Sequence, residues 1–271
     1  RRPGTDRGGA MARLKVGLQV RPQHTTYAEY ARAWLRADEL GVDSLWNWDH
    51  FFPLSGDPHG PHFEGWTTLA ALGPQTRNAT VGCLVLCMSY RNPAHLSQMA
   101  TTLDHATNGR LILGLGAGWA ERDYVEYGYE FGTAGDRLRN LERGLQIIKE
   151  RWAKDNPKPT NGSHVPILIG GSGAKVTLRI VAQYADLWNG TIPAAHFAER
   201  NKILDEWCAK VGRNPAAIER TVEFTTAELD DLDTFVAHGA THLILCWDAP
   251  FDFAPVEQLL AYRDRVNAGR A

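Results

Sequence analysis

A histidine and an aspartate follow directly after an apolar segment in the first quarter of the chain. The segment 44–48 has the composition of a short buried strand, and Asp49 and His50 come next. An imidazole at a strand end could donate or accept a proton, or hydrogen-bond a bound cofactor. The alternative is a structural histidine whose ring nitrogens bond Asp49 or a backbone carbonyl. Because ligand sites collect at the carboxyl ends of barrel strands, we predict that His50 is catalytic.

A second candidate is the glycine-rich segment between a predicted strand at 166–169 and a predicted helix at 176–184. Backbone N–H groups at a helix start can bind an anion without basic side chains. The alternative is a tight turn that needs glycine only for its backbone conformation. The segment lacks the lysine of a P-loop, and Gly114–Gly118 does not fit a dinucleotide-binding motif. Its members are Gly170, Gly171, Ser172 and Gly173.

Three other clusters look less like sites. His59 and His62 lie among turn-forming residues without further ligands in metal-type spacing, so we expect no metal. The run from Glu121 to Asp123 is interpreted as a solvated charge run. Arg137 is interpreted as part of the wet face of a helix.

The segments around these residues repeat as strand, loop and helix. Their strands are unbroken apolar runs, typical of a parallel sheet covered on both faces, and eight such units fit a (β/α)8 barrel. The predicted strands are 15–20, 44–48, 81–86, 110–115, 166–169, a segment at Leu187, 221–225 and 242–247. The predicted helices are 27–40, 66–72, one from Pro93 towards Gly109, 138–152, 176–184, 197–211, a short one at 232–238, and 256–266.

Length and composition agree with a single domain of this kind. The chain has 271 residues, of which 44% are hydrophobic, against about 250 residues for a typical barrel. A formal charge of -2 with interspersed signs offers no basic face for nucleic acid, and no apolar run approaches the ~20 residues of a membrane span. The four cysteines have no metal-type spacing, which favours reduced thiols and a cytoplasmic location. We expect residues 1–10 to be an N-terminal extension or a cloning remnant, and residues 11–271 to be one domain.

Two connections look too short for a barrel. One follows the helix at 138–152 near Lys154 and Asp155, and the other follows the strand at 221–225 near Ala227 and Glu228. Each leaves little chain to return to the next strand. We therefore predict a break in the chain path at both positions, the alternative being genuinely shortened connections.

Several motifs together resemble the luciferase-like monooxygenase superfamily, in the branch that uses the deazaflavin coenzyme F-420. Their order and spacing matter more than any one of them, and they cover most of the chain from Leu14 to Trp247. They are Asp43-Ser44-Leu45-Trp46, Asp49-His50-Phe51, Tyr90-Arg91-Asn92-Pro93, Asn108-Gly109-Arg110-Leu111, Gly114-Leu115-Gly116-Ala117-Gly118-Trp119, the segment 166–173 and Ala185-Asp186-Leu187-Trp188-Asn189.

The resemblance implies a luciferase-like TIM barrel with the coenzyme ring across its carboxyl-terminal mouth. It places the ring beside Asp49 and His50, the coenzyme phosphate on the glycine-rich segment, and Gln19 towards the substrate. It also implies a strand bulge behind the ring, with a non-proline cis peptide that we place at Cys83–Leu84. The implied cofactor-binding residues are Asp49, Cys83, Leu84, Val85, Leu86, Trp119, Gly170, Gly171, Ser172, Gly173, Trp188 and Asn189.

One departure bears on the substrate. The sugar-phosphate dehydrogenases of this superfamily place a glutamate just after the glycines at 114–118, where this chain has Trp119. The resemblance therefore implies an F-420-dependent oxidoreductase that transfers hydride to or from another small organic molecule, and it also implies a homodimer. The alternatives are an FMN-dependent monooxygenase on the same barrel and a carrier or sensor that binds F-420 without turnover.

Overall fold

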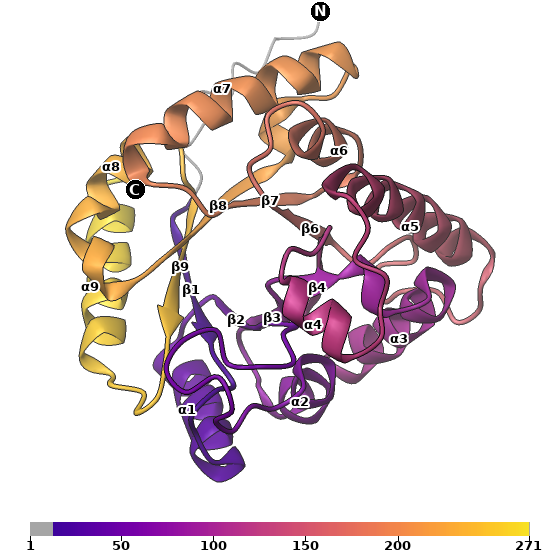
Figure 1. The fold of residues 1–271 in the computed structure, drawn as a ribbon. Helices are drawn as coiled ribbons and strands as arrows, with labels where there is room; N and C mark the ends of the chain where they lie inside the picture. The colour runs from indigo at the N-terminus through magenta and orange to yellow at the C-terminus, as the bar shows by residue number, and fades with distance from the viewer. Residues whose placement is uncertain (1–12, 271) are drawn as a thin grey trace, which may run out of the picture.

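The computed structural model of the chain describes residues 13–270, so the expected extension at 1–10 lies outside the described residues. In this part, parallel strands form one closed sheet in the order β3-β2-β1-β9-β8-β7-β6-β5-β4, with β3 also paired to β5 (Figure 1). Because β3 and β4 share one position, the predicted eight-stranded (β/α)8 barrel is confirmed. The strands are β1 (Lys15–Val20), β2 (Ser44–Asn47), β3 (Thr80–Cys83), β4 (Leu86–Cys87), β5 (Leu111–Gly116), β6 (Ile167–Gly170), β7 (Leu187–Gly190), β8 (Glu219–Phe224) and β9 (His242–Trp247).

Helices surround the strands and return the chain between them (Figure 1). The α-helices are α1 (Tyr27–Leu40), α2 (Gly65–Leu72), α3 (Pro93–Ala106), α4 (Glu121–Glu126), α5 (Ala134–Lys154), α6 (Thr177–Tyr184), α7 (Ala194–Lys210), α8 (Leu232–Ala237) and α9 (Ala254–Ala268). Short 3-10 helices are η1 (Gly73–Gln75), η2 (Met88–Tyr90), η3 (Pro215–Ala217) and η4 (Thr226–Asp231).

Apolar side chains fill two layers of the barrel. One cluster, the larger, lies between the strands and the helices and includes Val16, Leu18 and Trp34. The other joins side chains from six different positions around the sheet. Since both faces of each strand are covered, the strands carry unbroken apolar runs. The second cluster comprises Trp46, Leu84, Ile112, Leu168, Leu187 and Ile244.

Local signals explain where the first helices begin and end. Thr26 caps α1 and forms a capping box with Glu29, and Gly41 ends the helix with a φ of 85°. Asn92 caps α3 through its side-chain oxygen, and Pro93 takes the first helical position, where its missing N–H costs nothing.

The expected breaks near Lys154 and Ala227 are wrong. At the first position, Asp155 follows α5 directly and its backbone N–H donates to the Arg151 carbonyl at 2.7 Å. At the second, η4 leads into α8 without interruption, and the Glu228 N–H bonds the Thr225 carbonyl at 3.0 Å. Tight helical turns close these distances with few residues, so the connections are simply short.

Two helices differ from the sequence prediction. The run at 121–123 forms the first turn of α4, with Asp123 buried, and is not a solvated charge run. Arg137 is not on a wet face either: its guanidinium lies over the Phe131 ring at 3.9 Å and donates to the Gly118 carbonyl at 3.1 Å. Such contacts depend on the loop fold, which the local pattern does not contain.

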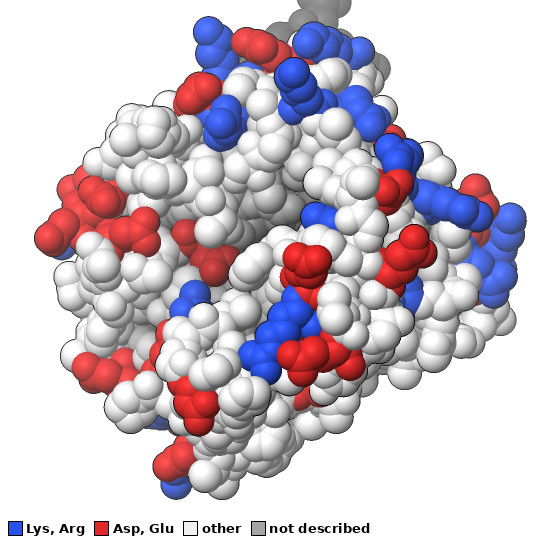
Figure 2. All heavy atoms as spheres, in the orientation of Figure 1, with Lys and Arg blue, Asp and Glu red and all other residues white. Residues whose placement is uncertain are grey.

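The surface around the barrel mouth mixes acidic and basic side chains (Figure 2). Among the helices of the described residues, none combines the length and the apolar character that a membrane crossing requires. All four cysteines are buried and free.

Candidate active site

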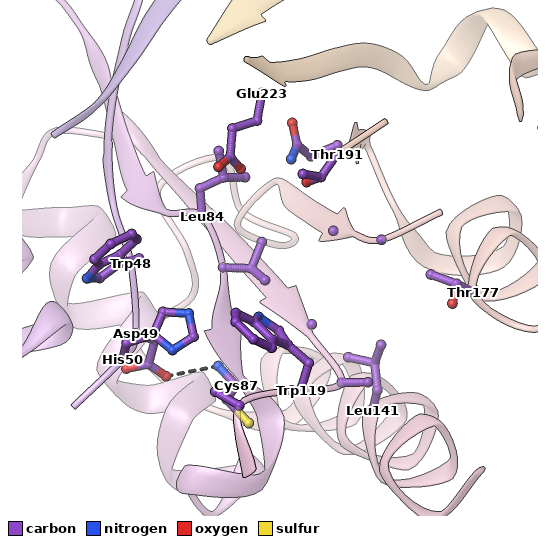
Figure 3. A pocket seen from close by; sticks show the side chains of 18 of the residues that line it. Trp48, Asp49, His50, Leu84, Cys87, Trp119, Leu141, Thr177, Thr191 and Glu223 are labelled. Carbon is purple, nitrogen blue, oxygen red and sulfur yellow. Dashed lines mark hydrogen bonds between the residues drawn. The ribbon is translucent and has the colours of Figure 1, made fainter. Parts of the chain in front are cut away.

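A cavity of about 560 Å³ opens at the carboxyl-terminal end of the strands. Residues from β1, β4, β5, β6, β7 and β8 and from the loop after β2 reach it, which is the arrangement expected of a barrel site. The predicted site residues that line it are Gln19, Asp49, His50, Leu84, Val85, Trp119, Gly170, Gly171, Ser172, Gly173 and Asn189. Figure 3 shows several of these side chains around the space.

His50 is held by a carboxylate from another element. Its Nδ1 lies 2.7 Å from Oδ2 of Asp123, while Oδ1 of Asp123 accepts the Phe51 N–H at 3.2 Å. Because a carboxylate only accepts, Nδ1 carries hydrogen and Nε2 is left for another partner. The ring packs edge-to-face between Trp48 and Trp119, with centroids 5.4 Å away in each case. The structural alternative named Asp49 or a backbone carbonyl as the partner, whereas the partner of Nδ1 is Asp123.

Asp49 reaches the cavity, but its carboxylate is already engaged. Arg91 donates to both oxygens at 2.6 and 2.7 Å, and the Cys87 N–H donates at 2.9 Å. Burial raises the pKa of Asp49, and the Arg91 charge and these hydrogen bonds oppose that shift. Asp49 therefore fixes the loop after β2 to the segment after β4, and a direct polar contact with a ligand would have to displace these bonds.

The predicted bulge is the two-residue break between β3 and β4. The backbone N–H of Leu84 still bonds the Asn47 carbonyl of β2 at 2.8 Å, so the strand continues one residue past Cys83. The cis peptide accordingly lies at Leu84–Val85, not at Cys83–Leu84. Gln19 donates its amide to the Leu84 carbonyl at 2.8 Å and so supports the bulge.

Three predicted cofactor contacts face away from the cavity. Cys83 and Leu86 are 1% exposed and belong to the outer core, because their positions on the strand point between sheet and helices. Trp188 is fully buried and stacks on Phe197 with a centroid distance of 5.4 Å. Its indole N–H instead donates to the Gly171 carbonyl at 2.8 Å and supports the glycine-rich loop from behind.

The glycine-rich loop leaves β6 and precedes α6. Gly171 has a φ of 120°, and its N–H bonds the Asn189 carbonyl of β7 at 3.0 Å. A Cβ at Gly170 would lie 3.0 Å from a methyl group of Val85, and one at Gly116 on β5 would lie 2.6 Å from the other methyl group. Because Gly116 and Gly170 have no side chains, Val85 packs directly against the backbone of these two strands.

His62 is engaged by a neighbouring aromatic side chain. Its ring stacks on Trp48 at 6.1 Å and Nε2 accepts the Trp48 indole N–H at 2.8 Å. Burial lowers the pKa of His62 to about 4, consistent with a neutral acceptor. Within residues 13–270, no group of three or more metal-ligating side chains is found.

Sequence reasoning missed several residues of the cavity, above all Glu223. It lies one residue before the end of β8, and its side chain is 15% exposed. A glutamate inside the apolar strand 221–225, next to the carboxyl end, was a usable signal. Asp123 and Arg91 gave no comparable signal, since their partners come from distant loops. Other lining residues that were not predicted include Arg21, Trp48, Cys87, Tyr90, Gly118, Thr177 and Thr191.

The strands and helices form a TIM barrel with a cavity at its mouth. The sequence model of the family described as luciferase-like monooxygenase matches residues 8–244. The chain therefore belongs to this family.

Two curated relatives are named F-420-dependent glucose-6-phosphate dehydrogenase. That of Amycolatopsis mediterranei (strain U-32) is 32% identical over 226 residues, covering 78% of this chain and 66% of the relative. That of Microbacterium testaceum (strain StLB037) is 30% identical over 221 residues, covering 73% and 63%. The chain thus spans somewhat less than two thirds of the length of these relatives.

A solved structure described as an F-420-dependent secondary alcohol dehydrogenase in complex with an F-420–acetone adduct shares the fold. Its TM-score is 0.80 at 16% identity, with 90% of this chain and 96% of that chain covered.

Proposed function

We propose that the chain is an F-420-dependent oxidoreductase that transfers hydride between the deazaflavin and a small organic substrate at the barrel mouth. The main support is the cavity at one end of the barrel. A glycine-rich loop, a bulged strand and a histidine bound to a carboxylate all line it. The names of the relatives at 30–32% identity support F-420 over other cofactors. When bound, a deazaflavin supplies a carbon centre that gives or takes hydride.

The residues present fit such a group. Gly116 and Gly170 leave one wall without side chains, so a flat ring could lie close to the backbone beside Val85. The loop at 170–173 precedes α6 and is suited to a phosphate through backbone N–H groups and the helix dipole. His50 would then hydrogen-bond the reacting end through Nε2, with Asp123 fixing its orientation.

The charges of the cavity favour an uncharged substrate. Arg21 is the one lysine or arginine among the described lining residues, and it already bonds Asp248 at 3.0 Å and Gln19 at 3.1 Å. A sugar phosphate would need a free cationic group beyond the coenzyme loop. With Trp119 after the glycines of β5, we therefore propose a substrate other than a sugar phosphate, despite the names of the relatives.

Parallel binding titrations with F-420 and FMN test the cofactor. We expect F-420 to bind at least about tenfold more tightly, a difference of roughly 1.4 kcal/mol. Preferential FMN binding, together with oxygen consumption by reduced FMN, would establish the monooxygenase alternative instead. Tight F-420 binding with no change of its absorbance across a panel of ketones and alcohols would favour a carrier or sensor.

The homodimer and the cytoplasmic location stay predictions. The homodimer follows from the family resemblance alone, and light scattering of the purified chain would measure it directly. A monomer mass would contradict it.

A further inference from the structure

Glu223 is the carboxyl group of the cavity that has no close cationic partner. Of the two acidic side chains among its described lining residues, Asp49 is fully engaged by Arg91 and a backbone N–H. The nearest cation to Glu223 is Arg21, at 3.8 Å, and that guanidinium makes its shorter bonds to Asp248 and Gln19. Glu223 therefore keeps hydrogen-bonding capacity for a ligand.

Its position directs that capacity into the cavity. The side chain leaves β8 and points into the space towards Leu84, close to Thr191 in the view of Figure 3. From β9, Cys246 donates its S–H to Oε1 at 3.2 Å, a weak bond that orients the carboxyl group without occupying both oxygens. The surroundings that a substrate would meet are apolar, chiefly Leu84, Val85 and Trp48.

The surroundings of Glu223 shift its pKa upwards. Burial raises the pKa of Glu223, while hydrogen bonds from Cys246 and Asn189 and the charge of Arg21 oppose the shift. The charged and titratable groups around it are Arg21, Cys246 and His50, with Asp248 beyond Arg21. A cavity carboxyl group whose pKa is raised in this way holds its proton to higher pH than an exposed glutamate, which suits it to general acid–base work.

We infer that Glu223 is the proton carrier of the reaction, and that the substrate is a small uncharged ketone or its secondary alcohol. This rests on the proposed function. In ketone reduction, hydride from the reduced deazaflavin forms a C–H bond at the carbonyl carbon, and the C=O π electrons move to oxygen. That oxygen takes the proton as the O–H bond of Glu223 breaks. The carboxylate that remains, beside Arg21 and Cys246, regains a proton from water.

Oxidation of the alcohol runs through the same groups in reverse. The Glu223 carboxylate takes the hydroxyl proton while hydride leaves the carbinol carbon for the oxidised deazaflavin. The acid thus comes from β8, whereas the residue after the β5 glycines is Trp119. His50 then contacts the reacting end without carrying the proton.

The test compares wild type with Glu223→Gln, which keeps the shape of the side chain and removes its titration. We expect single-turnover reduction of a ketone panel to fall by about 10²-fold or more, while the F-420 dissociation constant stays near wild type. The wild-type rate of ketone reduction should fall as pH rises through the pKa of Glu223. This falling limb of the pH–rate profile should be absent in Glu223→Gln. Asp248→Asn, which also removes a carboxylate beside Arg21, should keep the limb.

A readout without coenzyme checks the same claim. In infrared pH titrations of the unliganded protein, wild type should show a protonated carboxyl band that persists to higher pH than that of an ordinary glutamate and is missing in Glu223→Gln. Because a raised pKa stabilises the protonated folded state, wild type should also lose unfolding free energy relative to Glu223→Gln as pH rises above about 4.5.

Distinct results overturn distinct claims. Equal rates and an unchanged pH limb in Glu223→Gln, with F-420 bound normally, would remove the inference and leave the proposed function standing. A limb lost in His50→Asn but kept in Glu223→Gln would make His50 the proton carrier. Failure of wild type to bind F-420 would overturn the proposed function and this inference together.

Discussion

His50 depends on Asp123 for its tautomer and orientation. The 2.7 Å contact places hydrogen on Nδ1, and the same carboxylate anchors the Phe51 backbone that follows the histidine. Buried carboxylates that orient an imidazole in this way fix which ring nitrogen faces a ligand. Loss of the carboxylate should therefore harm the reaction almost as much as loss of the ring itself.

We expect His50→Asn and Asp123→Asn each to slow single-turnover hydride transfer by about 10²-fold or more, with F-420 affinity near wild type. The double variant should be little worse than either single one, because both act on one group. The matched control is Glu121→Gln, an exposed carboxylate in the same first turn of α4. Wild-type rates in His50→Asn would reduce it to a structural residue.

Sequence reasoning found the histidine but not its partner. His50 follows a strand with a clear apolar pattern, so its place at the mouth follows from the barrel alone. Asp123 lies in a short helix, 73 residues further on, and only the folded loops bring it to the ring. Asp49, next to His50 in sequence, turns instead to Arg91, because adjacent residues on extended backbone point in opposite directions.

The loop between β6 and α6 is shaped by contacts from behind. Gly171 needs its φ of 120°, and Trp188 and Asn189 of β7 hold its carbonyl and N–H. A valine at Gly171 would strain the backbone and come within 3.1 Å of Thr177, so that variant would report on folding as much as on binding. Ser172 offers a cleaner test of the predicted phosphate site.

We expect Ser172→Glu to weaken F-420 binding by at least about tenfold, since it places a negative charge beside the phosphate. Ser172→Ala should have a much smaller effect, and both variants should melt near the wild-type temperature. Gln98→Glu adds the same charge on an exposed position of α3 and serves as the control. Unchanged F-420 affinity in Ser172→Glu would place the phosphate elsewhere.

The sequence pattern predicted regular strands and helices well, but not the interruption of the strand at 81–86. The ranges of β1, α1 and β9 agree with the sequence prediction residue for residue. The apolar pattern predicts one strand at 81–86, and only the family resemblance implied a bulge there; the strand divides at Leu84 and Val85, with Val85 packed against Gly116 and Gly170. An apolar run carries no signal for such a break.

At the scale of the whole molecule, the two ends of the barrel do different work. The mouth holds the cavity, while the opposite end holds a chain of polar contacts that joins four adjacent strands. There, Glu219 of β8 accepts from Lys15 of β1 and contacts His242 of β9, each at 2.8 Å, and His242 contacts Ser44 of β2 at 2.7 Å. These bonds close the barrel where its first and last strands meet, which suits a role in stability.

Glu219 makes this closure dependent on pH. Burial acts to raise its pKa, but the bonds and charges of His242 and Lys15 outweigh it and lower the pKa to about 2. A folded pKa below the unfolded value contributes stability that is present above about pH 4.5 and lost as pH falls towards 2. We expect Glu219→Gln to cost roughly 2–3 kcal/mol of unfolding free energy at pH 7.

Urea titrations from pH 7 downwards measure this difference, and the gap between wild type and Glu219→Gln should narrow below pH 4.5. Glu199→Gln, at a carboxylate that is 61% exposed and pairs only with its neighbour Arg200, should change little at any pH. A gap that stays constant across the acid range would mean that shape, not charge, is what Glu219 contributes. Glu219 and Glu223 lie four residues apart on β8. Opposite pH trends in the unfolding free energy of their glutamine variants, each compared with wild type, would show that β8 stabilises the barrel at one end and places an acid in the cavity at the other.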